Sequence, residues 1–213
     1  TRTHVYSAGK FHADSALLVL VSTTLPFKIF KTQHFVSNDE RLVVTEADSG
    51  KRIVKEINGL PAAAEYARLV GVDVRALNSM SFAAAPVVVL IDGTDYVRSI
   101  QKANPDGTLT FFCAIDEGVV FRVAHGVGLV KNLEQTFDAI RKEIGKPQLV
   151  IGCDCILRRL EGEQGGLKDQ VAKLFQDNNA IGFNSYGEQF NGVHVNQTLT
   201  GIAIGAAPDS QDG

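Results

Sequence analysis

The feature that most constrains the fold is a series of β-prone segments separated by turn signals in the middle of the chain. Asp92-Gly93 is a pair typical of two-residue hairpin turns, and the residues from Asn104 to Gly107 give a longer turn signal. Hairpins join neighbouring strands in antiparallel order. The sequence therefore predicts an antiparallel β-meander with strands at 87–91, 96–102, 108–115 and 119–123.

Helical segments interrupt the strands without the regular alternation of βαβ units. Pro61 suits the first turn of a helix and Gly71 suits its end. Asn132 suits the N-terminus of a second helix, whose apolar residues recur at helical spacing as far as Ile144. The other predicted elements are strands at 3–6, 15–21, 27–35, 41–46, 52–57 and 148–153, helices at 156–161 and around 171–175, and a final hairpin at 181–205.

This mixture predicts an α+β fold with largely antiparallel or mixed sheets, packed helices and a closing C-terminal β-hairpin. We expect a strand-rich segment at 1–57, a main domain at 58–205 and a disordered tail at 206–213. The chain begins at Thr1 and its single methionine is Met80, so we expect a fragment of a longer protein.

Composition excludes several classes of protein. A net charge of −3 over 213 residues argues against a nucleic-acid surface. The longest apolar run, 16–21, is too short to span a bilayer. An odd number of cysteines, three, does not make a disulfide framework and predicts free thiols in a reducing cytoplasm.

Polar and apolar residues alternate near the C-terminus in the manner of a strand. The alternation places His194, Asn196 and Thr198 on one face, with Val193 and Val195 on the other. This pattern is equally compatible with a solvated strand face and with a ligand site.

Few residues indicate enzymatic chemistry. Cys113, Cys153 and Cys155 coexist with five histidines, but nothing in the sequence places a base beside a thiol, and free cysteines are among the most buried residues. The chain has no Gly-x-Ser-x-Gly elbow, phosphate loop or dinucleotide fingerprint. We therefore expect a protein without enzymatic activity, and we keep a thiol-dependent hydrolase as the least favoured alternative.

Histidines and arginines offer two kinds of binding site. Non-covalent haem needs only one axial histidine in an apolar pocket, and His34 and His194 are the candidates; a hydrogen-bonded structural histidine is the alternative for each. Arg98 and the Arg158-Arg159 pair are suited to bind a carboxylate, with surface ion pairs as the alternative.

Several segments together resemble the FIST sensory domain, covering its second half and the end of its first. The matching segments are 40–71, 92–100, 153–161 and 182–205. The most distinctive parts are Cys155-x-x-Arg158 and the box Gly-Phe-x-x-Tyr-Gly-Glu at 182–188. The resemblance implies site residues at Cys155, Arg158, Gly182, Phe183, Tyr186, Gly187 and Glu188.

FIST domains are ligand-sensing input modules coupled to histidine kinases, chemotaxis-type receptors or cyclic-dinucleotide enzymes, and the extended box resembles that of a nitric-oxide-sensing haemoprotein branch. The resemblance implies a sensor that binds haem b and responds to nitric oxide; the alternative is a sensor of an amino acid or another small carboxylate. The expected ligand contacts are Arg158, Cys155, Tyr186, Glu188, Asn196, Thr198 and Arg98, with His194 and His34 as candidate axial ligands.

Overall fold

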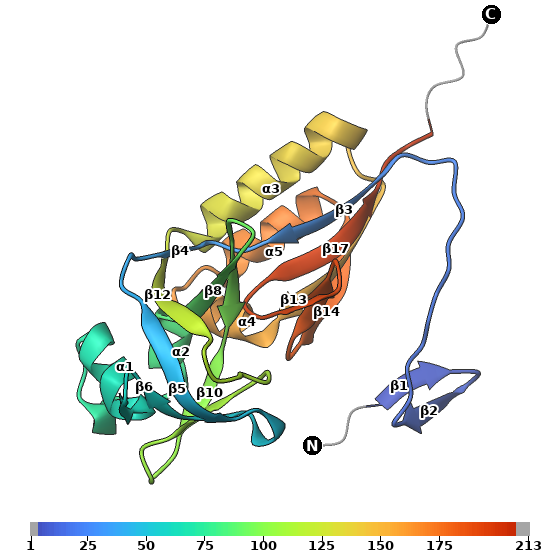
Figure 1. Ribbon diagram of the computed structural model, residues 1–213. Helices are drawn as coiled ribbons and strands as arrows, with labels where there is room; N and C mark the ends of the chain where they lie inside the picture. Colours follow the sequence, from blue (N-terminus) through green and yellow to red (C-terminus); the bar gives the residue numbers. More distant parts are fainter. Residues whose placement is uncertain (1–3, 208–213) are drawn as a thin grey trace, which may run out of the picture.

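The computed structural model describes residues 4–207 (Figure 1). It confirms the predicted α+β class, with two main sheets and five α-helices among the described residues. Residues 208–213 of the predicted disordered tail, and Thr3 of the first predicted strand, lie outside the described residues.

The larger sheet has nine strands and is antiparallel throughout. Its strands follow the order β10-β11-β6-β5-β12-β8-β9, with β4 paired to β12 and β7 paired to β6. Two hairpins of the predicted meander lie here, β8–β9 and β10–β11, and Asp92 and Gly93 adopt φ values of 49° and 76°, as the turn between β8 and β9 requires. The predicted strand 96–102 is divided at Ser99 into β9 and β10, which lie at opposite ends of the strand order, and β12 pairs with β4, β5 and β8 instead of with β11. The strands are β4 (Phe35–Ser37), β5 (Leu42–Asp48), β6 (Ile53–Ile57), β7 (Leu60–Pro61), β8 (Val87–Ile91), β9 (Thr94–Arg98), β10 (Ile100–Ala103), β11 (Leu109–Phe111) and β12 (Val120–Gly126).

Two α-helices accompany the larger sheet. Helix α1 (Ala62–Val70) begins after Pro61 and ends at Gly71, as predicted, and buries Tyr66 among the sheet residues. Helix α2 (Ser79–Ala84) was not predicted; Asn78 caps it by accepting hydrogen bonds from the backbone of Met80 and Ser81. Two short 3₁₀ helices, η1 (Ser49–Lys51) and η2 (Val74–Ala76), complete this part of the chain.

The smaller sheet has four strands in the order β14-β13-β17-β3. They are β3 (Phe27–Thr32), β13 (Leu149–Cys155), β14 (Ala180–Ser185) and β17 (Leu199–Ile204). Helices α3 (Leu129–Ile144), α4 (Ile156–Gln164) and α5 (Lys168–Asp177) accompany this sheet. The core between α3 and the sheet contains Phe30, Phe137, Val150 and Leu199.

The C-terminal segment is not one long hairpin. Strand β13 lies between β14 and β17, parallel to the first and antiparallel to the second. A parallel pair requires a crossover connection, here α4 and α5. The predicted hairpin is confined to β15 (Glu188–Phe190) and β16 (Val193–Val195).

Several predicted boundaries were wrong. Residues 15–21, predicted as a strand, form no regular element and their apolar side chains are exposed. The predicted strand 27–35 is interrupted after Thr32 and resumes at Phe35. Asn132 does not cap α3, since the helix begins at Leu129; its side chain bonds Thr32 and the Gln33 carbonyl instead. A separate hairpin, β1 (His4–Ser7) and β2 (Lys10–Ala13), precedes the exposed segment.

Candidate functional site

Two adjoining cavities form a cleft between the smaller sheet and its helices. Their volumes are about 170 and 280 Å³, and both are lined by Asp154, Phe175 and Asn184. We call this combined space the α5 cleft. Its remaining lining comes from β3, β13, β14, β17, α3, α4 and α5 and includes Phe30, Val150, Gly152, Gly182, Leu199, Phe137, Leu133, Arg158, Arg159, Glu163 and Lys168.

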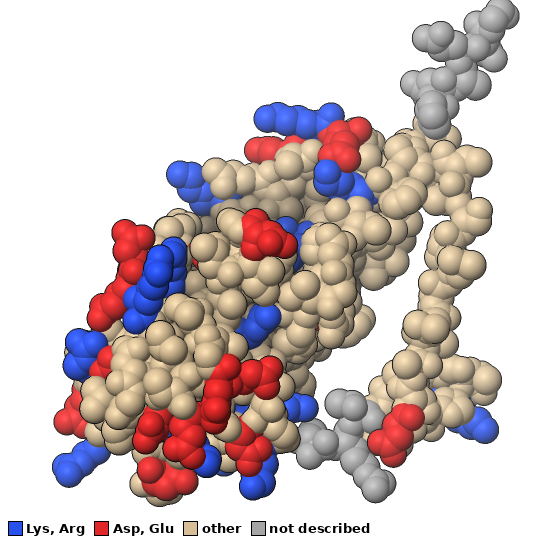
Figure 2. Space-filling view, in the orientation of Figure 1, with Lys and Arg blue, Asp and Glu red and all other residues tan. Residues whose placement is uncertain are grey.

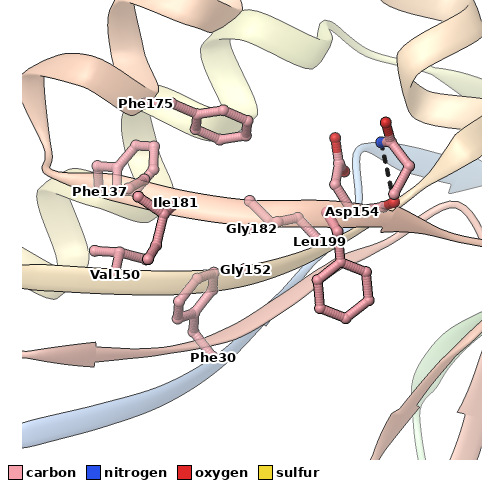
Figure 3. A pocket seen from close by; sticks show the side chains of 12 residues that line it. Phe30, Phe137, Val150, Gly152, Asp154, Phe175, Ile181, Gly182 and Leu199 are labelled. Atoms are coloured by element: carbon pink, nitrogen blue, oxygen red, sulfur yellow. Dashed lines mark hydrogen bonds between the residues drawn. The ribbon is translucent and has the colours of Figure 1, made fainter. Parts of the chain in front are cut away.

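One end of the α5 cleft is apolar. Phe175 and Phe137 lie over the strand residues Val150 and Gly182 (Figure 3). Gly182 leaves no room for a larger residue, because an added Cβ would lie 1.9 Å from the carbonyl oxygen of Gly152. This explains physically why the predicted box begins with glycine.

The other end of the α5 cleft is charged. Asp154 is the next-to-last residue of β13, and burial raises the pKa of its carboxyl although Arg158 opposes the shift. Arg159 is one residue further along α4 and points outward, with 57% of its side chain exposed. It donates hydrogen bonds to Glu163 Oε1 at 2.8 Å and to Asn184 Oδ1 at 3.4 Å. Exposed Lys168 at the start of α5 adds a second accessible cation.

Arg158, which the sequence favoured as the carboxylate-binding residue, is largely occupied by the protein itself. Its side chain is 1% exposed, and its Nε donates to Asp154 Oδ1 at 2.8 Å. Its Nη1 lies 3.3 Å from Nδ1 of His34. Because guanidinium can only donate, Nδ1 of His34 accepts this bond and its Nε2–H donates to Glu161 Oε1 at 2.7 Å. We call these four residues the charged network.

Most of the other predicted contacts form a second cluster, near β15 and β16. Glu188 is 3% exposed and accepts hydrogen bonds from the hydroxyls of Ser185 and Thr198. Burial raises the pKa of its carboxyl. The 194–200 segment is therefore not a solvated strand face: Asn196 and Thr198 are buried.

The buried amides join the two sheets. Asn196 Oδ1 accepts a hydrogen bond from the backbone of Ser99, and Gln197 Oε1 accepts one from the Ser99 hydroxyl. Gln197 also donates to the carbonyl of Ala83 at 2.9 Å. Arg98 donates to the carbonyl of His194 at 2.9 Å. We call residues 196–198 the amide strap.

The comparison with protein families agrees with this arrangement. Residues 62–191 match the FIST C domain and residues 1–60 match the FIST N domain. The chain belongs to the FIST family. No curated protein and no solved structure gives a significant match. FIST domains are generally non-catalytic sensory modules of signalling proteins, and this establishes the general class of this chain.

The FIST C match includes most of the α5 cleft but not every predicted site residue. Asp154, Arg158 and Asn184 lie inside the matched range, whereas His194 and the amide strap follow its end. Sequence reasoning missed Asp154 and Asn184 as cleft residues. The sequence signal was their position: Asp154 immediately precedes the Cys155-x-x-Arg158 motif, and Asn184 lies within the Gly-Phe-x-x-Tyr-Gly-Glu box.

The thiols of this FIST chain are not activated. All three cysteines are free, and Cys155 is buried at the junction of β13 and α4. Burial raises the pKa of its thiol to about 11, and the Glu188 carboxylate adds to the shift. The thiol is therefore protonated at neutral pH, and a thiolate nucleophile has no support here.

The two candidate haem ligands lie away from the α5 cleft and have ring nitrogens close to protein groups. His34 has both ring nitrogens within hydrogen-bond reach of protein groups and a side chain with 0% exposure. His194 is half-buried, with Nε2 3.3 Å from the Asn196 amide. Neither histidine lines the α5 cleft.

The lengths and hydropathy of the helices test whether any of them could span a membrane. Among the helices of residues 4–207, none is long and apolar enough to cross a membrane.

Tyr186, the last of the predicted contacts, is 65% exposed, and its carbonyl accepts a hydrogen bond from Asn196.

Proposed function

We propose that this FIST chain is the input module of a signalling protein and binds an amino acid or another small carboxylate in the α5 cleft. The observation that carries the proposal is the pairing of an apolar end, with Phe137 and Phe175, and a charged end. A few convergent polar groups beside apolar walls are typical of small-molecule sites.

The charged end supplies groups of both signs. Arg159 and Lys168 are exposed cations suited to the ligand carboxylate, while Asp154 and Glu163 are suited to an amino group. The two cavities of the cleft, of about 170 and 280 Å³, together lie in the lower part of the roughly 300–1,000 Å³ range of ligand pockets. The size of the cleft therefore favours a small metabolite over a large ring system.

Binding would be transmitted through α4. Asp154 and Arg158 contribute to the cleft and to the charged network, and His34 extends that network to the connection between β3 and β4. A ligand that contacts Asp154 differently in two arrangements of this network biases the equilibrium between them. A difference of about 1–3 kcal/mol in binding free energy between the two arrangements is sufficient. The receiving partner is a histidine kinase or a cyclic-dinucleotide enzyme, and the free cysteines favour a reducing cytoplasm.

The test is a panel of amino acids and small carboxylates added to the full chain, with melting temperature and titration calorimetry as readouts. Arg159→Met and Lys168→Met should each weaken binding about 10–100-fold, since a hydrogen bond to a charged group contributes roughly 1.5–3 kcal/mol. Lys173→Met is the matched control: Lys173 is also on α5, is 74% exposed and pairs with Asp177.

A panel in which no compound raises the melting temperature would contradict the proposal. Haem b with nitric oxide stays a prediction from the family resemblance. Adding haemin to the same protein tests it directly: a sharp Soret band that shifts with nitric oxide supports haem sensing, and no Soret band removes it.

A further inference from the structure

The smaller sheet has an apolar face that is largely exposed in the part of the chain that the structure describes. Four isoleucines form a row across its strands, since each is the register partner of the next: Ile29, Ile202, Ile151 and Ile181. Ile29 is 58% exposed and Ile181 is 63% exposed. We call this surface, with Phe27 and Phe183 in the flanking rows, the isoleucine face. At its β14 edge, Ile181 and Phe183 also line the smaller cavity of the α5 cleft.

This face differs from an ordinary solvated sheet surface. A sheet that meets water on one side normally carries polar residues there, whereas strands that are apolar on both faces are normally covered on both. Here Phe30 and Val150 pack toward the helices while Ile29 and Ile151 point away. An exposed apolar patch of this kind marks a contact surface.

A second apolar surface on the same chain is exposed. Residues 4–25, which we call the N-terminal arm, comprise β1, β2 and the extended segment before β3. Leu18 is 92% exposed and Leu20 is 100% exposed. Figure 1 shows the arm leaving the body at the start of β3, with β1 and β2 standing apart from the rest.

We propose that the isoleucine face is covered by the N-terminal arm of a second copy of this chain, in a symmetric exchange. Each chain carries both surfaces, so a two-fold dimer covers both arms and both faces at once. The arm has few charges, with Lys10 and Asp14 its only Lys, Arg, Asp or Glu residues. In Figure 2 the arm is accordingly almost all tan.

Two further observations favour exchange between chains. The arm supplies about 20 residues, which matches the roughly 20–30 residues per side of a standard interface. Its link to the body is fixed: the carbonyl of Pro26 accepts a hydrogen bond from Gly205 at 2.8 Å. Leu25, preceding proline, is restricted to extended conformations, which disfavours an immediate reversal onto its own sheet.

The test is the mass of the full chain in solution by light scattering coupled to size exclusion. We expect a dimer at micromolar concentration. Leu20→Asp on the arm and Ile29→Lys on the isoleucine face should each raise the dissociation constant at least 100-fold. Val74→Asp is the control, because Val74 is 43% exposed on η2, remote in sequence from both surfaces; it should leave the dimer intact.

Mixing the two variants distinguishes exchange from other contacts. An equimolar mixture of Leu20→Asp and Ile29→Lys retains one intact arm and one intact face in each heterodimer, so dimers should partly return. A monomeric wild-type chain would overturn the proposal. If hydrogen exchange then showed protected backbone amides in the arm of that monomer, the arm would be packed within its own chain, and the proposal would be wrong for that reason. A dimer that both variants leave unchanged would overturn it equally.

Discussion

Two buried polar clusters connect parts of this FIST chain that are far apart in sequence, and they use different chemistry. The charged network joins Asp154, Arg158, His34 and Glu161 beside the α5 cleft. The amide strap uses neutral groups of Asn196 and Gln197 to hold Ser99 and Ala83. The network touches a cavity, whereas the strap fills the contact between two sheets.

The difference separates two roles that looked alike in sequence. The amides of the strap have protein partners, so the strap acts as a structural joint. In the charged network Glu161 Oε2 is buried without a partner among the described residues. A charged cluster that lies next to a cleft and has an unpaired oxygen is suited to adopt two different sets of hydrogen bonds. A sensor requires two such states, because the ligand acts by favouring one of them.

The largest expected effect comes from breaking the charged network. Arg158→Met leaves the Asp154 carboxylate buried without its cation, and we expect a loss of about 3–5 kcal/mol in the free energy of unfolding. Urea unfolding measures this loss. Arg159→Met is the matched control, because its exposed guanidinium should change stability by less than about 0.5 kcal/mol. Equal effects of the two substitutions would remove the distinction between the buried and the exposed arginine.

A smaller loss is expected from the amide strap. Gln197→Ala leaves the Ala83 carbonyl and the Ser99 hydroxyl without this partner, and we expect the free energy of unfolding to fall by about 1–3 kcal/mol. Ligand affinity in the α5 cleft should stay within about twofold of wild type, since Gln197 does not line it. A large change in affinity at unchanged stability would instead place the strap in the sensing mechanism.

The smallest effect is the pH dependence contributed by Glu188. Burial raises the pKa of its carboxyl in the folded state above the usual value of 4.5. The folded state therefore retains this proton where the unfolded state has lost it, and stability falls as pH rises from about 4.5 through the raised pKa. Glu188→Gln should flatten this decline in urea midpoints measured from pH 4 to pH 7. An unchanged pH profile would show that Glu188 is not its source.

Much of the fold followed from the sequence because its signals are local. Gly71 ends α1 in a left-handed conformation with φ of 72°, and Asp92-Gly93 makes the predicted turn. Such positions depend on the conformations open to one or two residues. Helix α2 was missed because its stabilising contacts are tertiary: Phe82 packs on Tyr66.

The candidate site was only partly predictable. The Cys-x-x-Arg motif and the Gly-Phe-x-x box indicated the right strands and the right helix. They did not indicate that Arg158 is buried and that Arg159 is accessible. Adjacent helical residues point in different directions, and which one faces the interior depends on what packs against the helix.

By itself the sequence determined the α+β class, the FIST family, the meander turns and the first helix. Tertiary structure alone decided which polar groups meet: His34 and Arg158 are 124 residues apart, and Ser99 and Gln197 are 98 apart. It also placed β13 between β14 and β17, and it left the isoleucine face exposed. Turns are fixed by local backbone sterics, whereas a buried polar residue takes its role from whichever distant partner satisfies it.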